Sequence, residues 1–194
     1  MARTSNTKEN ILQNALVVFA EKGYEASSVA DIAETLGIGK SALYKHYKSK
    51  RDIFESILSR MEEREVAFKE QYCYVGADGT PDFKKLEEYV FALFCKWTED
   101  PFCAAFRKML TLEQFTNAEM AGLYRRYLTE GPVFELTETF SSFGGNKTAA
   151  MGMAMYLYSP LYLYYSMYDS ADEKAVVTRA ARAHVHRFMV QLHV

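Results

Sequence analysis

The apolar residues near the start of the chain recur at the spacing of a helix. They fall at positions i, i+1, i+4 and i+5, which predicts a helix with one apolar stripe over residues 7–22. Gly23 ends this helix, because glycine readily adopts the left-handed conformation that follows a helix. Ser27 or Ser28 then offers a side-chain oxygen that caps the next helix.

Two short helices are predicted next, over residues 29–36 and 40–47, and glycines lie in the link over residues 37–39. Two short helices joined by a glycine-containing turn, with a basic second helix, form a helix-turn-helix pattern. A longer helix over residues 50–72 follows, with an apolar inner face and a charged outer face.

The breakers in the remaining chain separate further helical stretches. Residues 75–81 form the clearest loop, and Thr80-Pro81 is expected to start a helix with proline at its first position. Ser170 and Glu173 have the spacing of a capping box for a last helix that ends near residue 192. The other expected breaks are Asp100-Pro101, Asn117, Gly131-Pro132 and Gly144-Gly145.

The pattern predicts an all-α fold of about nine helices, since no segment alternates with the period of a strand. We expect a three-helix, helix-turn-helix domain over residues 1–50 and a helical bundle over residues 51–194. The helix over residues 51–72 joins the two domains.

Charge is distributed unevenly along the chain. The whole chain has a net charge of −2, but residues 1–60 carry nine basic and seven acidic residues. Five bases and no acid lie between Gly37 and Arg51. A basic run of this kind is either a solvated face or a surface that meets phosphate groups.

A recognition helix presents short or polar side chains to base edges, while neighbouring cations and hydroxyls hold phosphates. Lys40, Ser41 and Lys45 are placed to reach bases. Ser28, at the start of the preceding helix, is expected to hold a phosphate. The residues expected to meet the DNA backbone are Tyr44, His46, Lys48 and Lys50.

The run SSVADIAETLGIGKSALYKHYKSKRDIFESIL resembles the DNA-binding signature of TetR-family (tetracycline-repressor-like) regulators. The tract from Ala42 to Arg51 is the most specific part, and residues 19–24 resemble the end of the first helix in that family. The similarity covers roughly residues 7–60. Ala30 departs from the pattern, because some relatives place a base-contacting arginine there.

This resemblance implies a second, effector-binding domain and a homodimer formed through the last two helices. Small residues near Gly152 would let helices of two copies approach closely. The alternative is that both helices belong to the core of one chain. The residues expected at the dimer interface are Met153, Leu157, Ala180, His184, Arg187 and Phe188.

Aromatic residues are frequent in the centre of the chain, where they fill either a core or a cavity. Together they indicate a largely apolar cavity with a few polar groups, suited to a flat or lipophilic effector. The residues expected to line it are Phe94, Trp97, Phe106, Phe115, Tyr124, Tyr127, Phe134, Tyr158 and Tyr162.

The residues do not favour an enzyme, a cofactor or a metal site. Three cysteines without paired spacing predict neither a disulfide framework nor a zinc site, and catalytic motifs are absent from the sequence. The N-terminus has no apolar leader, so a cytoplasmic location is expected. The uncharged residues 149–168 are long enough for a membrane span, but their tyrosines favour a buried helix and no membrane partner.

Together with the helix-turn-helix pattern, the resemblance implies a ligand-responsive, homodimeric regulator, most simply a repressor, that binds a double-stranded palindromic operator. Lys50→Ala is expected to weaken DNA binding and to lower its salt slope by about one. Two alternatives stay open. One is a helical ligand-binding or protein-interaction module without sequence-specific DNA binding, and the other is a membrane-associated regulator that uses residues 149–168.

Overall fold

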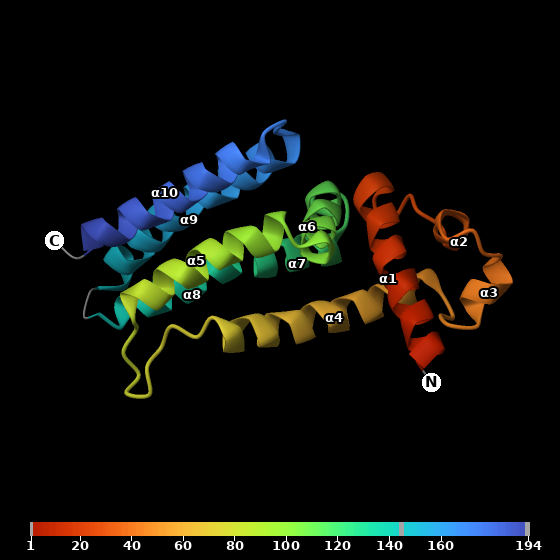
Figure 1. Cartoon of the computed structure of the whole chain (residues 1–194), viewed down its shortest axis with the longest axis horizontal. Coiled ribbons are helices and arrows are strands. Elements are labelled where there is room, and N and C mark those ends of the chain that lie inside the picture. The colour runs from red at the N-terminus through yellow and green to blue at the C-terminus, as the bar shows by residue number, and fades with distance from the viewer. Residues whose placement is uncertain (1, 144–145, 193–194) are drawn as a thin grey trace. The chain divides into compact units, whose positions relative to one another are not determined.

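The computed structural model describes residues 2–143 and 146–192, and those residues confirm the all-α prediction with ten helices (Figure 1). Two single residues, Val75 and Pro81, form an isolated antiparallel bridge in the loop after the fourth helix. The helices are α1 (Ala2–Lys22), α2 (Val29–Thr35), α3 (Lys40–Tyr44), α4 (Lys50–Gln71), α5 (Phe83–Thr98), α6 (Pro101–Glu113), α7 (Ala118–Leu128), α8 (Glu130–Ser141), α9 (Lys147–Ser170) and α10 (Lys174–Leu192).

The chain divides into two compact units. Unit 1 consists of Met1–Phe68 with Pro101–Ala121, and unit 2 consists of Lys69–Asp100 with Gly122–Val194. Helix α4 therefore begins in unit 1 and ends in unit 2, while α6 belongs to the same unit as the first three helices. The membership of α6 in unit 1 was not predicted from the sequence.

Unit 1 is built on the apolar stripe of α1. The side chains of Ile11, Ala15 and Phe19 are buried, and α1 packs against both α2 and α6. Burial of each large apolar side chain of this kind stabilises the fold by about 1.5–3 kcal/mol. Ile32 of α2 and Leu43 of α3 are also fully buried, so each short helix is fixed by one deep apolar anchor.

The turns of unit 1 follow the predicted glycine and serine positions. Gly23 has a φ of 86° and Gly37 a φ of 63°, so each adopts the left-handed conformation after its helix. Ser28 caps α2, and Asp31 completes a capping box by accepting from the Ser28 backbone N–H.

Unit 2 packs α9 against α8, α10 and α5, and α10 also contacts α5. Its interior is aromatic: the ring of Phe94 stacks on that of Tyr165 at 5.8 Å, and Trp97 meets Tyr127 edge-on at 6.3 Å. Offset and edge-to-face pairs of this kind are favoured by the quadrupoles of the rings. No helix in the described part of the chain is long and apolar enough to cross a membrane.

Four predicted helix boundaries differ from the structure or lie outside the described residues. Pro81 does not start α5, because Asp82 caps that helix by accepting from two backbone N–H groups, at 2.9 and 3.2 Å. Ser170 ends α9 and its hydroxyl donates to the Ser166 carbonyl at 3.2 Å, so it caps nothing that follows. The break expected at Gly144-Gly145 lies outside the described residues.

The break expected at Gly131-Pro132 is replaced by the start of α8. Proline is tolerated there because the N–H groups of the first helical turn have no partner within the helix. Gly131 is required by a close approach, since a Cβ at this position would lie 1.8 Å from the Arg126 carbonyl oxygen. A single residue, Thr129, therefore links α7 to α8.

Candidate DNA-binding surface and effector groove

Helix α3 exposes most of its polar side chains because its packing uses only one face. Leu43 and the following Tyr47 are buried, whereas Lys40, Ser41 and Lys45 are exposed. Tyr44 is 50% exposed, which is a large fraction for an aromatic side chain and is typical of an interaction surface. The prediction that these residues form an accessible surface thus agrees with their exposure; their contact with DNA stays a prediction.

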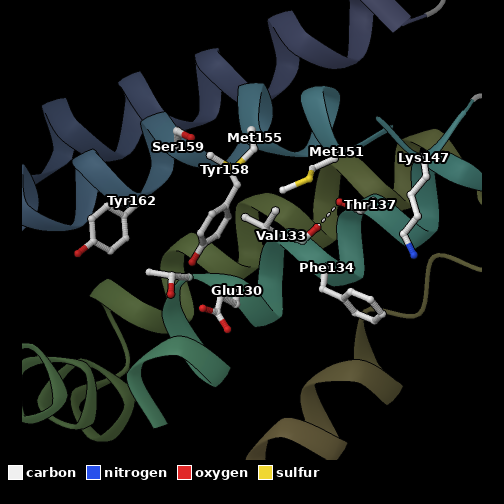
Figure 2. Close-up of a pocket in the computed structure, with 11 residues that line it drawn as sticks. Glu130, Val133, Phe134, Thr137, Lys147, Met151, Met155, Tyr158, Ser159 and Tyr162 are labelled. Carbon is white, nitrogen blue, oxygen red and sulfur yellow. Dashed lines mark hydrogen bonds between the residues drawn. The ribbon is translucent and has the colours of Figure 1, made fainter. Parts of the chain in front are cut away.

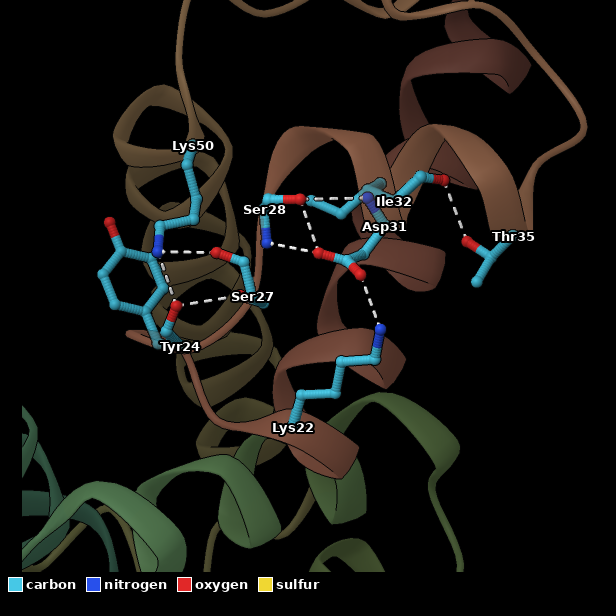
Figure 3. Close-up of polar contacts among 8 residues, drawn as sticks. All are labelled: Lys22, Tyr24, Ser27, Ser28, Asp31, Ile32, Thr35 and Lys50. Carbon is cyan, nitrogen blue, oxygen red and sulfur yellow. Dashed lines mark hydrogen bonds and ion pairs between the residues drawn. The ribbon is translucent and has the colours of Figure 1, made fainter.

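The start of α2 is held by a network centred on Asp31 (Figure 3). The carboxylate of Asp31 accepts from the Ser28 backbone N–H at 2.7 Å and from the Ser28 hydroxyl at 2.5 Å. Lys22, at the end of α1, pairs with the same carboxylate at 2.5 Å. The hydrogen bond from Lys22, followed by those from Ser28, holds the pKa of Asp31 well below its ordinary value.

This network changes the expectation for Ser28. Its hydroxyl is exposed but already donates to Asp31 and accepts from the Asp31 backbone N–H at 3.2 Å. A phosphate here would also meet the Asp31 carboxylate, whose charge Lys22 offsets. Lys22 and Asp31 were not among the residues predicted from the sequence, although the serine-x-x-aspartate spacing of a capping box indicates a role for Asp31.

Lys50 requires a correction, because its ammonium group is directed into unit 1. Its Nζ donates to the backbone carbonyls of Tyr24 at 2.6 Å and Ser27 at 2.9 Å (Figure 3). It also donates to the Glu25 carbonyl at 3.2 Å. It also lies 4.4 Å from the centroid of the Tyr24 ring. An ammonium has three N–H donors, so Lys50 is engaged in holding the loop between α1 and α2 and has no donor left for a phosphate.

The remaining backbone-contact candidates divide by exposure. The side chain of Lys48 is exposed, and its backbone N–H donates to Asp52 at 2.8 Å, which fixes the first turn of α4. His46, two residues after the end of α3, is half-buried. Lys48 is therefore the better candidate for a phosphate contact, in place of Lys50.

Helix α6 and the residues after it brace the same loop from within unit 1. Glu113 is only 5% exposed, and its carboxylate accepts from the Glu25 backbone N–H at 3.0 Å. The Asn117 amide donates to the Glu25 carboxylate at 2.8 Å. Arg51 of α4 meets Glu119 of α7 with two hydrogen bonds, at 2.6 and 2.9 Å. No sequence pattern indicated these contacts, which join residues 68–92 positions apart.

A groove of about 530 Å³ lies between α8 and α9, within unit 2 (Figure 2). Its volume is in the range of small-molecule sites. Its lining is mainly apolar, and a few polar side chains lie among the apolar ones. The lining residues are Thr129, Glu130, Val133, Phe134, Thr137, Lys147, Met151, Met155, Tyr158, Ser159 and Tyr162.

Tyrosine hydroxyls lie beside one end of this groove. Tyr158 donates to the Leu128 carbonyl at 2.8 Å, and the hydroxyls of Tyr124 and Tyr162 are hydrogen-bonded to each other. Burial raises the pKa of Tyr158 well above its ordinary value, so this phenol is uncharged. The groove is therefore supplied with neutral hydrogen-bonding groups at this end.

The structure brings only three of the nine predicted ligand residues to the groove: Phe134, Tyr158 and Tyr162. Phe106 is buried on α6 in unit 1, and Phe115, also in unit 1, is 86% exposed. These two need correction, since they belong to the other unit. The remaining four are buried within unit 2 and do not line the groove: Phe94, Trp97, Tyr124 and Tyr127.

The predicted dimer residues also need correction at two positions. Leu157 is 0% and Phe188 5% exposed, so both pack within their own chain and have almost no surface to offer a partner. Met153, Ala180 and His184 are half-buried, with His184 Nε2 2.9 Å from the Leu157 carbonyl oxygen, and Arg187 is exposed.

An uncharged stripe is exposed beside those residues on α9 and α10. Its members on α9 recur at intervals of four and seven residues, which places them on one helical face. We call these exposed residues the α9–α10 stripe: Gly152, Tyr156, Leu163, Met167, Val176, Ala183 and Val190.

Within the described residues, no group of three or more histidine, cysteine or acidic side chains is placed to hold a metal ion. Cys73 is exposed, Cys95 half-buried and Cys103 buried, and all three are free thiols.

Comparison with known proteins gives consistent matches. Residues 11–57 match the sequence model of the family described as bacterial regulatory proteins, tetR family. A negative transcriptional regulator of the biofilm operon icaADBC, IcaR from Staphylococcus aureus strain Newman, is 44% identical over 48 residues. That match covers 25% of this chain and 26% of IcaR, so the chain spans about a quarter of the length of this curated relative.

Solved structures match over nearly the whole chain. A TetR-family regulator from Agrobacterium tumefaciens superposes with a TM-score of 0.66 at 18% identity, over 95% of this chain and 98% of that one. PfmR, a TetR-family regulator from Thermus thermophilus, gives 0.62 at 25% identity, over 93% and 97%. Nearly the whole chain thus shares their fold.

Proposed function

Since the chain belongs to the TetR family through its N-terminal domain, residues 11–57, we propose that it is a homodimeric transcriptional repressor. It binds a palindromic operator with one helix-turn-helix per subunit, and a small, largely apolar effector releases it. The comparisons support a DNA-binding regulator; the operator, the dimer and the effector are our proposal.

The exposed face of α3 is the observation that carries this proposal. Lys40, Ser41 and Lys45 extend from a helix whose position is fixed by Leu43. A helix that enters the major groove needs polar side chains on its outer face and rigid packing beneath it. The Asp31 network and the Lys50 contacts hold α2 and its preceding loop, so the outer face is held ready for DNA.

The homodimer is supported by the α9–α10 stripe. Exposed apolar side chains grouped on one helical face are typical of an interaction site, and the exposed members of the stripe include Leu163 and Met167. Two copies that pack these helices together form a four-helix interface. In the dimer that we propose, the two recognition helices lie about 34–36 Å apart, one turn of DNA, which is the spacing that a palindromic operator requires.

The effector acts by favouring a state of the dimer in which the recognition helices no longer match the operator spacing. A ligand shifts such an equilibrium only by the difference in its affinity for the two states. The groove between α8 and α9 supports this part of the proposal, because α9 both lines the groove and carries the stripe.

Selection from genomic DNA tests the proposal. Purified protein is mixed with genomic fragments at moderate salt, and the bound fragments are sequenced. We expect enrichment of a short palindrome, and loss of that enrichment in a Ser41→Ala, Lys45→Ala variant with an unchanged circular dichroism spectrum. A folded, dimeric protein that enriches no sequence would favour the other candidate, a helical ligand-binding or protein-interaction module.

A further inference from the structure

We propose that the groove between α8 and α9 binds an uncharged, elongated lipophile whose hydroxyl group lies at the tyrosine end. This inference rests on the proposed function, since it names the chemical class of the effector.

The groove extends along several turns of α9. Its α9 wall extends from Lys147 to Tyr162, and fifteen residues of helix correspond to about 22 Å. Met151 and Met155 lie along this wall, facing Val133 of α8 (Figure 2). Methionine side chains are flexible and polarisable, so they adapt to an unbranched chain better than to a rigid ring.

Charges at the groove are compensated within the protein. Lys147 pairs with Glu138 at 3.0 Å, and Glu130 lies 3.7 Å from Arg125. An ionised ligand headgroup would lose hydration without meeting a charge that lacks a partner. The wall between these pairs is apolar, and the Thr137 hydroxyl donates to the Val133 carbonyl at 2.7 Å. Compensated charge on the protein is therefore complementary to an uncharged ligand.

The tyrosine end supplies an acceptor for one neutral polar group. The Tyr158 hydroxyl gives its proton to the Leu128 carbonyl, so its oxygen can only accept further hydrogen bonds. Tyr165 takes part in one of these, and the second lone pair is the acceptor for a ligand. Tyr162 lies beside it in the lining, and its hydroxyl is paired with that of Tyr124. A ligand hydroxyl can donate to the Tyr158 oxygen, whereas a carboxylate has no proton to donate there.

Calorimetric titration of the full chain, without DNA, tests this assignment. The probes are unbranched primary alcohols of increasing length, together with the carboxylic acid and the amine of each length. We expect affinity for the alcohols to rise about fourfold per methylene until the chain fills the groove. The acid and the amine should bind at least about tenfold more weakly. An acid or an amine that binds as tightly as its alcohol would overturn the proposal.

Variants localise the binding. Val133→Trp fills the groove and should abolish alcohol binding, whereas Leu112→Trp, an equal insertion on the exposed face of α6, should leave it unchanged. Tyr158→Phe should reduce the preference for an alcohol over its methyl ether, which has no proton to donate. Equal binding by the wild type and Val133→Trp would place the ligand elsewhere and overturn the proposal.

The outcomes separate this inference from the proposed function. If the protein binds alcohols but enriches no genomic DNA, the proposed ligand class stands and the proposed repressor function fails. If the protein binds an operator but no alcohol, the proposed repressor function stands and the proposed ligand class fails. If Val133→Trp instead weakens the dimer in sedimentation and no alcohol binds, a second copy of the chain covers the groove and the proposal fails.

Discussion

Removing the ammonium group of Lys50 should destabilise unit 1 without removing a phosphate contact. Lys50→Met keeps most of the side-chain length but leaves the carbonyls of Tyr24, Glu25 and Ser27 without their donor. Charge-assisted hydrogen bonds contribute about 1.5–3 kcal/mol each. The bonds to Tyr24 and Ser27 are partly buried, whereas the bond to Glu25 is exposed and adds little. We therefore expect the free energy of unfolding to fall by about 2–4 kcal/mol.

Urea denaturation followed by circular dichroism measures this loss, and Lys48→Met provides the control. Lys48 is exposed, so its substitution should change the free energy of unfolding by less than about 0.5 kcal/mol. The two variants should have the opposite ranking in DNA binding. Lys48→Met should lower the salt slope of DNA affinity by about one, and Lys50→Met should leave that slope unchanged. A stable Lys50→Met protein with a reduced salt slope would refute the structural role of Lys50.

Three further predictions follow from unit 1 and from the α9–α10 stripe. Gly23→Ala should lower the thermal midpoint, because the φ of 86° disfavours a side chain and the new Cβ would lie 2.6 Å from the Glu113 carboxylate oxygen; an unchanged midpoint in a melting scan would contradict this. Leu163→Asp should yield monomers in sedimentation velocity, since it places a charge on an exposed apolar face; dimers of wild-type affinity would move the interface elsewhere. Asp31→Asn should remove a stability contribution that is present above the ordinary carboxyl pKa of about 4 and is lost as pH falls, because the native pKa is lowered chiefly by Lys22. Melting scans should therefore show the gap between wild type and Asp31→Asn narrowing below about pH 4, and a gap that widens there would refute a lowered native pKa.

The local features of the fold were predictable because they depend on neighbours in the sequence. Gly23 and Gly37 ended their helices as expected, and Ser28 capped α2. Contacts between distant positions were not predictable in this way. Lys50 is a residue type that commonly binds phosphate, but its three N–H groups donate to backbone carbonyls that lie 23–26 residues earlier in the chain. Glu113 reaches Glu25 across 88 positions without any pattern in the sequence to indicate it.

The aromatic residues show the same limit for the candidate ligand site. Periodicity identified Phe134, Tyr158 and Tyr162 as aromatic positions on helices, and they line the groove. It could not separate them from Trp97, which fills the core, because a core and a cavity wall demand the same residue type at the same spacing. Phe115 was indistinguishable from both, although it lies in a solvent-exposed turn after α6.

The discontinuous make-up of unit 1 sets a rule for building chimeric regulators from this chain. A graft cut after residue 50 would transfer the recognition helix but discard α6, against which α1 packs. In the transferred segment, part of the apolar stripe of α1 would be exposed to solvent. The loop between α1 and α2 would lose the hydrogen bond from the Glu25 backbone N–H to Glu113. A chimera that is to keep the operator specificity of this chain therefore needs both segments of unit 1. Residues 101–121 have to be transferred as a second insert, in addition to the N-terminal segment.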